Sequence, residues 1–241
     1  MEIEKNALFH GIESGDLQRM LVCSRARMKT YRRGDVLFLQ GDTPYYLYVL
    51  MAGKVALVRN LISGRKNIFF EVEEGDVFGE QYFFNGEKSY WYGAEVSARA
   101  EVLEIPMEFF SCFCNEACDH HRQLVQNMLN ILAQKEWTTM QKMHILSPTS
   151  LKGRIAIWLL EEADGEGVVK LTMNREALAN YLGVARPSLS RTLMKLQEEK
   201  VIAVDKKEIR ILNKDFLDDF YKEGKVCNHG YILFLLFLVK M

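Results

Sequence analysis

The spacing of apolar residues changes character along the chain. In residues 1–30, apolar side chains such as Leu17, Met20 and Leu21 recur at helical steps, which predicts short helices. Between residues 31 and 106, short β-rich runs alternate with glycine-containing turns, a pattern typical of a barrel or jelly-roll. The expected strands are residues 36–39, 46–51, 55–58, 68–72 and 102–105.

A long segment without glycine or proline follows, from about residue 115 to residue 146. Its apolar positions alternate between steps of four and three, as in a coiled coil, with interruptions at Glu136 and Thr139. The positions of this seam are Val125, Leu129, Leu132, Glu136, Thr139, Met143 and Leu146, and Leu124, Met128 and Ile131 widen its apolar side. A helix of this length spans on the order of 45 Å, more than the core of a monomer needs. We therefore expect a homodimer interface here, with a long core helix as the alternative.

A second domain is expected after this helix. The run Ser147-Pro148-Thr149 ends the long helix, because a residue before proline disfavours the helical conformation. Ser150 is placed to cap the next helix, which we expect over residues 151–163. The domain boundary is therefore expected at residues 147–149.

Residues 174–199 have the pattern of a helix-turn-helix. Asn174 is a good N-cap for a short helix over 175–181, and a second helix is expected from about 186 to 199. Between them, Ala179 permits the two helices to approach closely, and Gly183 supplies a turn conformation that other residues resist.

The second of these helices has a polar and basic outer face. Its first turn is where such a helix meets base edges in the major groove, and arginine is the usual reader of guanine. Two apolar runs, 201–204 and 209–211, flank a basic tip and predict a two-stranded wing. The candidate DNA-binding residues are Arg175, Arg186, Ser188, Ser190, Arg191, Lys206 and Lys207. The alternative is a solvated charged helix in a winged fold that does not bind DNA.

The charge distribution agrees with a local nucleic-acid surface. Residues 170–214 hold ten basic and five acidic side chains, a formal charge of +5, whereas the whole chain has a net charge of −1. The N-terminal residues lack a signal-peptide pattern, and five cysteines are an odd number, which favours a reducing, cytoplasmic compartment. The apolar run 231–239 is about nine residues long, against the ~20 that span a bilayer, so we expect no membrane partner.

Taken in order, these features resemble the CRP/FNR superfamily of bacterial transcription regulators. The resemblance covers residues from about Leu8 to Asn213. It rests on Leu39-Gln-Gly41-Asp42, Leu47-Tyr-Val-Leu50, Gly53, Phe78-Gly79-Glu80 and Gly153-Arg154-Ile155-Ala156, besides the helix-turn-helix. It implies an α+β fold with an N-terminal cyclic-nucleotide-binding-like β-roll (jelly-roll), a long dimerisation helix and a C-terminal winged helix-turn-helix. It also implies double-stranded DNA and RNA polymerase as partners.

The resemblance divides the chain into a β-roll sensor domain over 1–114, a dimerisation helix over 115–147, a winged helix-turn-helix domain over 148–222 and a tail of unknown role over 223–241. The expected function is binding to a palindromic operator under the control of an effector sensed by the roll.

The expected effector site departs from the family that the chain resembles. In cyclic-nucleotide binders of that family, the Gly-Glu pair is followed by Arg-Ser-Ala or Arg-Thr-Ala. That arginine neutralises the cyclic phosphate, and the glutamate binds the ribose hydroxyl. Here Tyr90 and Trp91 stand at the Arg-Ser positions, and no arginine lies between Arg65 and Arg99. Burying a phosphate without a nearby cation is unfavourable, so we expect that cAMP does not bind unless Lys88 reaches it.

The region around this site is aromatic, and two interpretations stay open. Either the rings fill the pocket that holds the nucleotide in cyclic-nucleotide binders, or an apolar or aromatic effector stacks among the rings above Glu80. The aromatic residues are Tyr82, Phe83, Phe84, Tyr90, Trp91 and Tyr92. The expected effector pocket consists of Gly79, Glu80, Tyr82, Tyr90, Trp91 and Thr139, and no particular cofactor is indicated.

The recognition helix shows a second departure. Its start reads Arg186-Pro187-Ser188-Leu189-Ser190-Arg191, and the Ser-Arg pair matches the FNR-like pattern. Pro187 replaces a glutamate that accepts a hydrogen bond from a base amino group, so the operator should differ at one base. Proline is compatible with this position because it lies in the first turn.

Two other classes of protein remain to be weighed. A redox or metal-sensing regulator would use Cys112, Cys114 and Cys118, with His120 and His121 nearby, but their spacing is not a standard zinc or iron–sulfur motif. A cupin-like metalloenzyme needs histidines on the roll, and none lies between residues 11 and 119. We therefore predict that the protein is not an enzyme.

Overall fold

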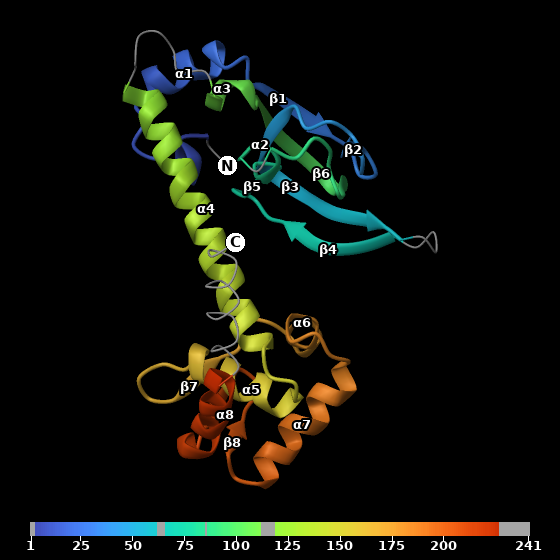
Figure 1. Cartoon of the computed structure of the whole chain (residues 1–241), viewed down its shortest axis with the longest axis vertical. Helices are drawn as coiled ribbons and strands as arrows, with labels where there is room; N and C mark the ends of the chain where they lie inside the picture. The colour runs from blue at the N-terminus through green and yellow to red at the C-terminus, as the bar shows by residue number, and fades with distance from the viewer. Residues whose placement is uncertain (1–2, 62–65, 85, 112–118, 227–241) are drawn as a thin grey trace, which may run out of the picture. The chain divides into compact units, whose positions relative to one another are not determined.

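The computed structural model describes residues 3–61, 66–84, 86–111 and 119–226. It divides the chain into an N-terminal unit, residues 1–134, and a C-terminal unit, residues 135–241 (Figure 1). The elements that begin in the N-terminal unit are η1 (Ile3–Lys5), η2 (Ala7–Phe9), α1 (Ser14–Cys23), β1 (Arg27–Tyr31), β2 (Val36–Phe38), β3 (Tyr46–Asn60), β4 (Lys66–Val72), β5 (Val77–Phe78), α2 (Gln81–Phe84), β6 (Gly93–Pro106), α3 (Glu108–Ser111) and α4 (Asp119–Leu146). Helix α4 continues across the boundary into the C-terminal unit. The limits of the four segments expected from the sequence therefore stay a prediction.

The strands of the N-terminal unit form one antiparallel β-roll. The strand order is β1-β6-β3-β4, with β2 paired to β6 and β5 paired to β3. Side chains of β3 alternate between two cores, as the two-residue period of a strand requires. Tyr48 and Leu50 face the aromatic interior of the roll, whereas Leu47, Val49 and Met51 pack against the N-terminal helices. Because both faces of the first part of β3 are buried, residues 46–52 are an unbroken apolar run.

The roll corrects two expectations about its strands. Residues 27–31 form strand β1 rather than part of a helix, because they pair along β6 from Glu104 to Ala100. The expected strands 46–51 and 55–58 are one strand, β3, and Gly53 lies inside it at a register shift instead of in a turn. Gly53 has φ +93°, and a Cβ there would lie 2.0 Å from the carbonyl oxygen of Arg99, so only glycine fits.

The first half of α4 belongs to the core of the N-terminal unit. Leu124 and Met128 are buried against the N-terminal helices. Asn127 fixes the helix there, because its Nδ2 donates to the carbonyls of Leu8 and His10 at 2.9 and 2.8 Å. Residues 112–118, which include the expected start of this helix, lie outside the described residues.

The C-terminal unit is a winged helix-turn-helix. Its further elements are α5 (Leu151–Glu162), β7 (Val168–Lys170), α6 (Arg175–Tyr181), α7 (Arg186–Glu198), β8 (Ile202–Val204), β9 (Glu208–Ile211) and α8 (Lys214–Val226). The expected two-stranded wing has a third strand, since β9 pairs with both β7 and β8. Strand β7 is too short and too distant in sequence to be recognised before its partner is known. Helix α8, also not anticipated, buries Leu217 in the core of this unit.

None of the helices among the described residues is long and apolar enough to cross a membrane. The apolar run 231–239 lies outside these residues.

Candidate functional site

Local hydrogen bonds build the helix-turn-helix as the sequence predicts. The Asn174 side chain caps α6 by accepting from the backbone N–H groups of Glu176 and Ala177 at 3.0 and 2.9 Å. Gly183 has φ +67° in the turn, which is the conformation that favours glycine. Ala179 and Leu189 are fully buried between the helices. These contacts fix the direction in which α7 leaves the turn.

Arg154 holds the turn from α5. Its Nε donates to the Pro148 carbonyl at 3.0 Å, and its Nη1 donates to the Leu182 carbonyl at 3.2 Å. The residue before it, Gly153, leaves no room for a side chain, because a Cβ would lie 2.9 Å from the Cβ of Pro148. Both Gly153 and Arg154 belong to the sequence pattern. The role of Arg154 in holding the turn could not be predicted, because it depends on contact with Leu182, which is distant along the chain.

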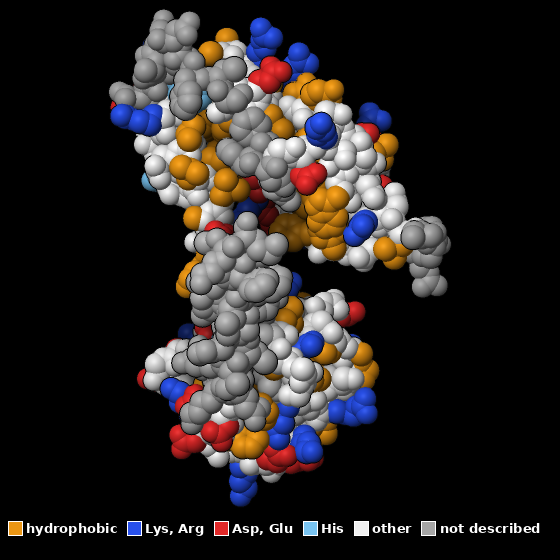
Figure 2. Space-filling view, viewed as in Figure 1, with side chains coloured by type: hydrophobic (Ala, Val, Ile, Leu, Met, Phe, Trp, Pro, Cys, Tyr) orange, Lys and Arg blue, Asp and Glu red, His pale blue; other side chains and the backbone are white. Residues whose placement is uncertain are grey.

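Helix α7 separates an apolar face from a basic one. Leu189, Leu193 and Leu196 are buried, whereas Arg186 and Arg191 are exposed on the opposite side. Ser188 and Ser190 are half-buried between the two faces, and Pro187 lies in the first turn as expected. That turn contains no acidic residue. Figure 2 shows Lys and Arg side chains over α7 on the visible face of the C-terminal unit, which suits an anionic partner.

Arg175 lies deeper than the other candidate DNA-binding residues. It is half-buried beside Ser190 and Gln197 in a recess of about 170 Å³. Its Nη1 is buried and has no hydrogen-bond partner among the described residues, and burial lowers the pKa of its guanidinium. Arg175 therefore lies beside α7, and its Nη1 donor makes no hydrogen bond within the described residues.

The tip of the wing presents two lysines. Lys206 and Lys207 are exposed, and the turn that holds them is closed by Asp205 N–H donating to the Glu208 carbonyl at 2.9 Å. The Asp205 side chain accepts from the backbone N–H of Lys206 at 2.6 Å. The two ammonium groups are therefore displayed on a structured turn.

The interior of the β-roll is filled by aromatic rings. Tyr90, at the position where the resembled family has its arginine, is only 2% exposed. Its ring stacks on Phe38 with centroids 3.8 Å apart and meets the edge of Tyr82 at 4.6 Å. Burial raises the pKa of the Tyr90 phenol, so it stays neutral and supplies no positive charge. This packing favours the interpretation that the rings occupy the place of a ligand.

The expected partners of Tyr90 in the effector pocket lie in different surroundings. Gly79 and Glu80 are buried at the end of β5, and Gly79 has φ +84°. Trp91 is 48% exposed and stacks on Phe69 at 5.1 Å, outside the interior. The side chains of residues 83 and 84 are outside the described part of the structure.

Two cations lie near this region. Arg59, from β3, has its guanidinium carbon 5.4 Å from the Trp91 ring centroid, a contact that sequence spacing does not reveal. Lys88 is exposed and lines a recess of about 490 Å³ together with two acidic residues, Glu87 and Glu108.

The last residue of the expected effector pocket is Thr139. It is exposed on α4 in the C-terminal unit, where its Oγ1 donates to the Lys135 carbonyl at 2.8 Å.

Helix α4 exposes a mostly apolar face that shares only some positions with the expected seam. Leu132 packs against the core of the N-terminal unit, although the heptad pattern counted it in the seam. Three positions of the expected seam, Leu129, Glu136 and Met143, are exposed, and Ala133, Trp137 and Met140 are exposed beside them, with Leu129 at 52% and Met140 at 59%. Positions 129, 133, 136, 140 and 143 again alternate between steps of four and three, so the exposed face has coiled-coil spacing.

The alternative redox or metal sensor depends on three cysteines and two histidines. Cys112, Cys114 and Cys118 lie outside the described residues. Of the neighbouring histidines, His120 lies 3.7 Å from Asp16, and His121 stacks on Phe109 with centroids 4.7 Å apart. Within the described ranges, no group of three potential metal ligands comes together.

Comparisons with known proteins agree with this architecture. Residues 28–117 match the family described as the cyclic nucleotide-binding domain, and residues 153–220 match the Crp-like helix-turn-helix domain. The global nitrogen regulator of Synechococcus elongatus is 26% identical over 195 residues, which cover 78% of this chain and 86% of that protein. The cyclic AMP receptor protein of Thermus thermophilus is 27% identical over 217 residues, which cover 88% and 95%.

Among solved structures, the c-di-GMP-responsive global regulator CLP of Xanthomonas campestris has a TM-score of 0.55. It is 20% identical, and the match covers 83% of this chain and 99% of that chain. This likeness shows the shared fold.

Proposed function

The chain belongs to the CRP/FNR superfamily of bacterial transcription regulators, and from this membership we propose that it binds a palindromic operator as a homodimer, under the control of an effector other than cAMP. Its coarse function is that of its relatives, a DNA-binding transcription regulator and not an enzyme. RNA polymerase as a partner and the cytoplasm as the location belong to the same proposal, since a bacterial regulator meets its DNA and the polymerase there.

The observation that carries the DNA-binding part is the division of α7 into a buried leucine face and an exposed face with Arg186 and Arg191. A dimer would present two such helices to successive major grooves, about 34–36 Å apart. Arg191 is assigned to base reading, with Arg186 and Ser190 beside it. The wing lysines, as flexible point charges, are assigned to phosphates.

Replacing Arg191 by alanine should cost ~1–3 kcal/mol of operator binding and relax specificity at one base pair per half-site. Replacing both Lys206 and Lys207 by alanine should instead weaken operator and random DNA alike and flatten the dependence of log affinity on log salt. The measurement is fluorescence anisotropy with operators selected by the wild-type protein from a random DNA pool. Equal losses on operator and random DNA for Arg191→Ala would contradict its role as a base reader.

The effector part of the proposal rests on the aromatic filling of the roll. The relatives bear names that point to nitrogen, cyclic AMP and c-di-GMP, so membership in the superfamily does not select an effector. In this chain the arginine position is a buried, neutral Tyr90 stacked on Phe38. A phosphate would exchange a charge-assisted contact for an ordinary hydrogen bond of ~1 kcal/mol at best.

Calorimetry should therefore detect no binding of cAMP or cGMP to the purified protein at micromolar nucleotide. The cyclic AMP receptor protein of Thermus thermophilus serves as the positive control. Micromolar affinity in the wild type would overturn the prediction. If that affinity disappeared in Lys88→Ala, the loop lysine would be the missing cation.

A further inference from the structure

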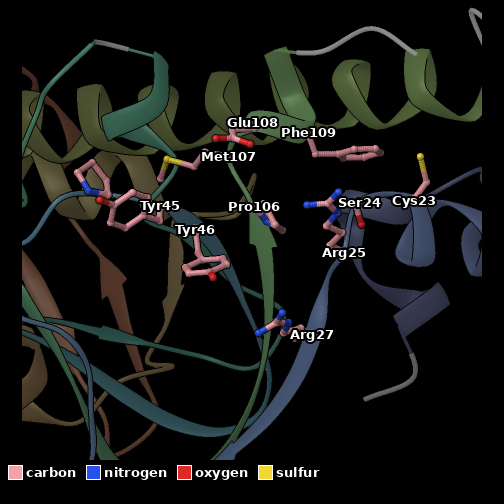
Figure 3. A pocket seen from close by; sticks show the side chains of 11 residues that line it. Cys23, Ser24, Arg25, Arg27, Tyr45, Tyr46, Pro106, Met107, Glu108 and Phe109 are labelled. Carbon is pink, nitrogen blue, oxygen red and sulfur yellow. The ribbon is translucent and has the colours of Figure 1, made fainter. Parts of the chain in front are cut away.

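We propose that a groove at one end of the β-roll binds a small aromatic acid, a flat ring bearing a carboxylate or phosphate. The groove has a volume of about 830 Å³ and lies where β1 and β3 begin and β6 ends (Figure 3). This volume is within the range of about 300–1,000 Å³ that small-molecule sites occupy. The groove adjoins the roll interior that holds Tyr90, because Tyr46 and Met107 line the groove and also pack in that core. The inference does not depend on the DNA-binding proposal.

Two arginines give the groove its charge. Arg25 and Arg27 are exposed along its wall, and neither forms an ion pair with another residue in the described part of the chain. Lys29, two residues further along β1, is instead neutralised by Glu104 at 2.7 Å. Glu108 lies on the opposite side of the groove from Arg27 in Figure 3, so the charged side chains of the lining leave one net positive charge. Guanidinium groups bind carboxylate and phosphate through paired hydrogen bonds, which makes an acid the expected ligand.

The end of α1 holds the backbone of Arg25 in a defined conformation. Arg25 has φ +57° at the end of α1, where its N–H donates to the Val22 carbonyl and the Ala26 N–H donates to the Leu21 carbonyl, both at 3.1 Å. This hydrogen-bond pattern ends a helix and places its left-handed residue at a position that glycine usually occupies. The same pattern holds Lys200 at φ +56° after α7, and a basic side chain suits the C-terminal end of a helix. The cap therefore fixes the backbone from which the Arg25 guanidinium reaches the groove.

Aromatic side chains and Pro106 form the rest of the groove lining that matters for binding. Tyr46, the first residue of β3, faces the groove next to Pro106, and Phe109 of α3 lies at the other end (Figure 3). Aromatic side chains favour stacked or edge contacts with a planar ligand. Pro106 restricts its own backbone, and Tyr46 is paired with it across β3 and β6. The groove is therefore largely formed before a ligand arrives, which lowers the entropic cost of binding.

The test is calorimetric or NMR titration of the full chain with phenyl phosphate and with benzoate, beside inorganic phosphate and phenol. At least one of the two aromatic acids should bind with millimolar affinity, and inorganic phosphate and phenol should each bind at least about tenfold more weakly, because each offers only half of the recognition. Arg27→Gln and Arg25→Gly should each reduce the affinity for the aromatic acid at least about fivefold. Arg33→Gln, an equal change of charge at an exposed arginine outside the groove, should leave the affinity unchanged.

Arg25→Gly separates binding from folding. Glycine suits φ +57° better than arginine, so its melting temperature should be unchanged or higher while the affinity falls. Saturable binding that is lost in both arginine variants but kept in Arg33→Gln supports the site. The proposal is overturned if neither aromatic acid binds, if inorganic phosphate binds as tightly as phenyl phosphate, or if the arginine variants keep the wild-type affinity.

Discussion

Replacing Met140 by lysine should dissociate the proposed homodimer and lower operator affinity by about 10²–10⁴-fold. Met140 is 59% exposed in the middle of the apolar face of α4, between Glu136 and Met143. In a dimer that uses this face, an ammonium group would be buried among apolar side chains without a partner. Each monomer would then meet one half-site alone and lose the gain in affinity that two linked recognition helices provide.

Light scattering and anisotropy on a selected operator measure the two effects. Thr138→Lys is the matched control, because it adds the same charge at an exposed position about 160° around the helix from Met140, opposite the apolar face. It should remain a dimer with near wild-type affinity. A Met140→Lys protein that stays fully dimeric would place the interface elsewhere. Leu132 is the poorer target, since it packs within the N-terminal unit and its replacement would perturb folding.

Replacing Tyr90 by alanine should destabilise the β-roll by about 3–5 kcal/mol, the range for loss of a large buried ring. Tyr90 is 2% exposed and contacts the rings of Phe38 and Tyr82. Its backbone also closes the neighbouring loop, through Tyr90 N–H to the Asp42 carbonyl at 2.9 Å and Gly41 N–H to the Tyr90 carbonyl at 2.8 Å. The backbone hydrogen bonds remain in the variant, so the loss would report the side chain, that is, its ring contacts and the hydrogen bond from its Oη to the Tyr46 carbonyl at 3.4 Å.

Urea unfolding followed by near-ultraviolet circular dichroism gives the free energy of the roll. Trp91→Ala is the control, because Trp91 is the next residue and also aromatic, but it is 48% exposed. Its replacement should cost about 1 kcal/mol or less, as is usual for a partly exposed site. Similar losses for the two variants would mean that the interior is not packed on Tyr90. That outcome would support the alternative interpretation, in which an effector binds among the rings of the roll.

The helix-turn-helix could be derived from the sequence because its determinants are local. A cap at Asn174, a glycine at 183 and buried leucines at helical spacing lie within a few turns of one another, and the structure contains each of them in the expected role. The exposed arginines of α7 follow from the same periodicity, since a helix that buries one face must expose the other.

The β-roll could be derived only in outline. Strand β1 has no strong pattern of its own and becomes a strand by pairing with β6, about 75 positions away. Gly53 looks like a turn until the close approach of Arg99 shows that it is a bulge within β3. Helical spacing alone also could not tell which side of α4 stays exposed. That side depends on the contacts of Leu124 and Met128 with the N-terminal helices.

The candidate ligand sites depend most on tertiary contacts. The sequence shows that an arginine is missing at position 90, but only the stacking on Phe38 shows that a neutral ring takes up that space. The groove with Arg25 and Arg27 joins the end of α1, the starts of β1 and β3 and the end of β6, which no spacing along the chain brings together. Periodicity reports which side of an element is apolar. Which distant element covers that side, and where two elements leave a space between them, is decided by packing of the whole domain.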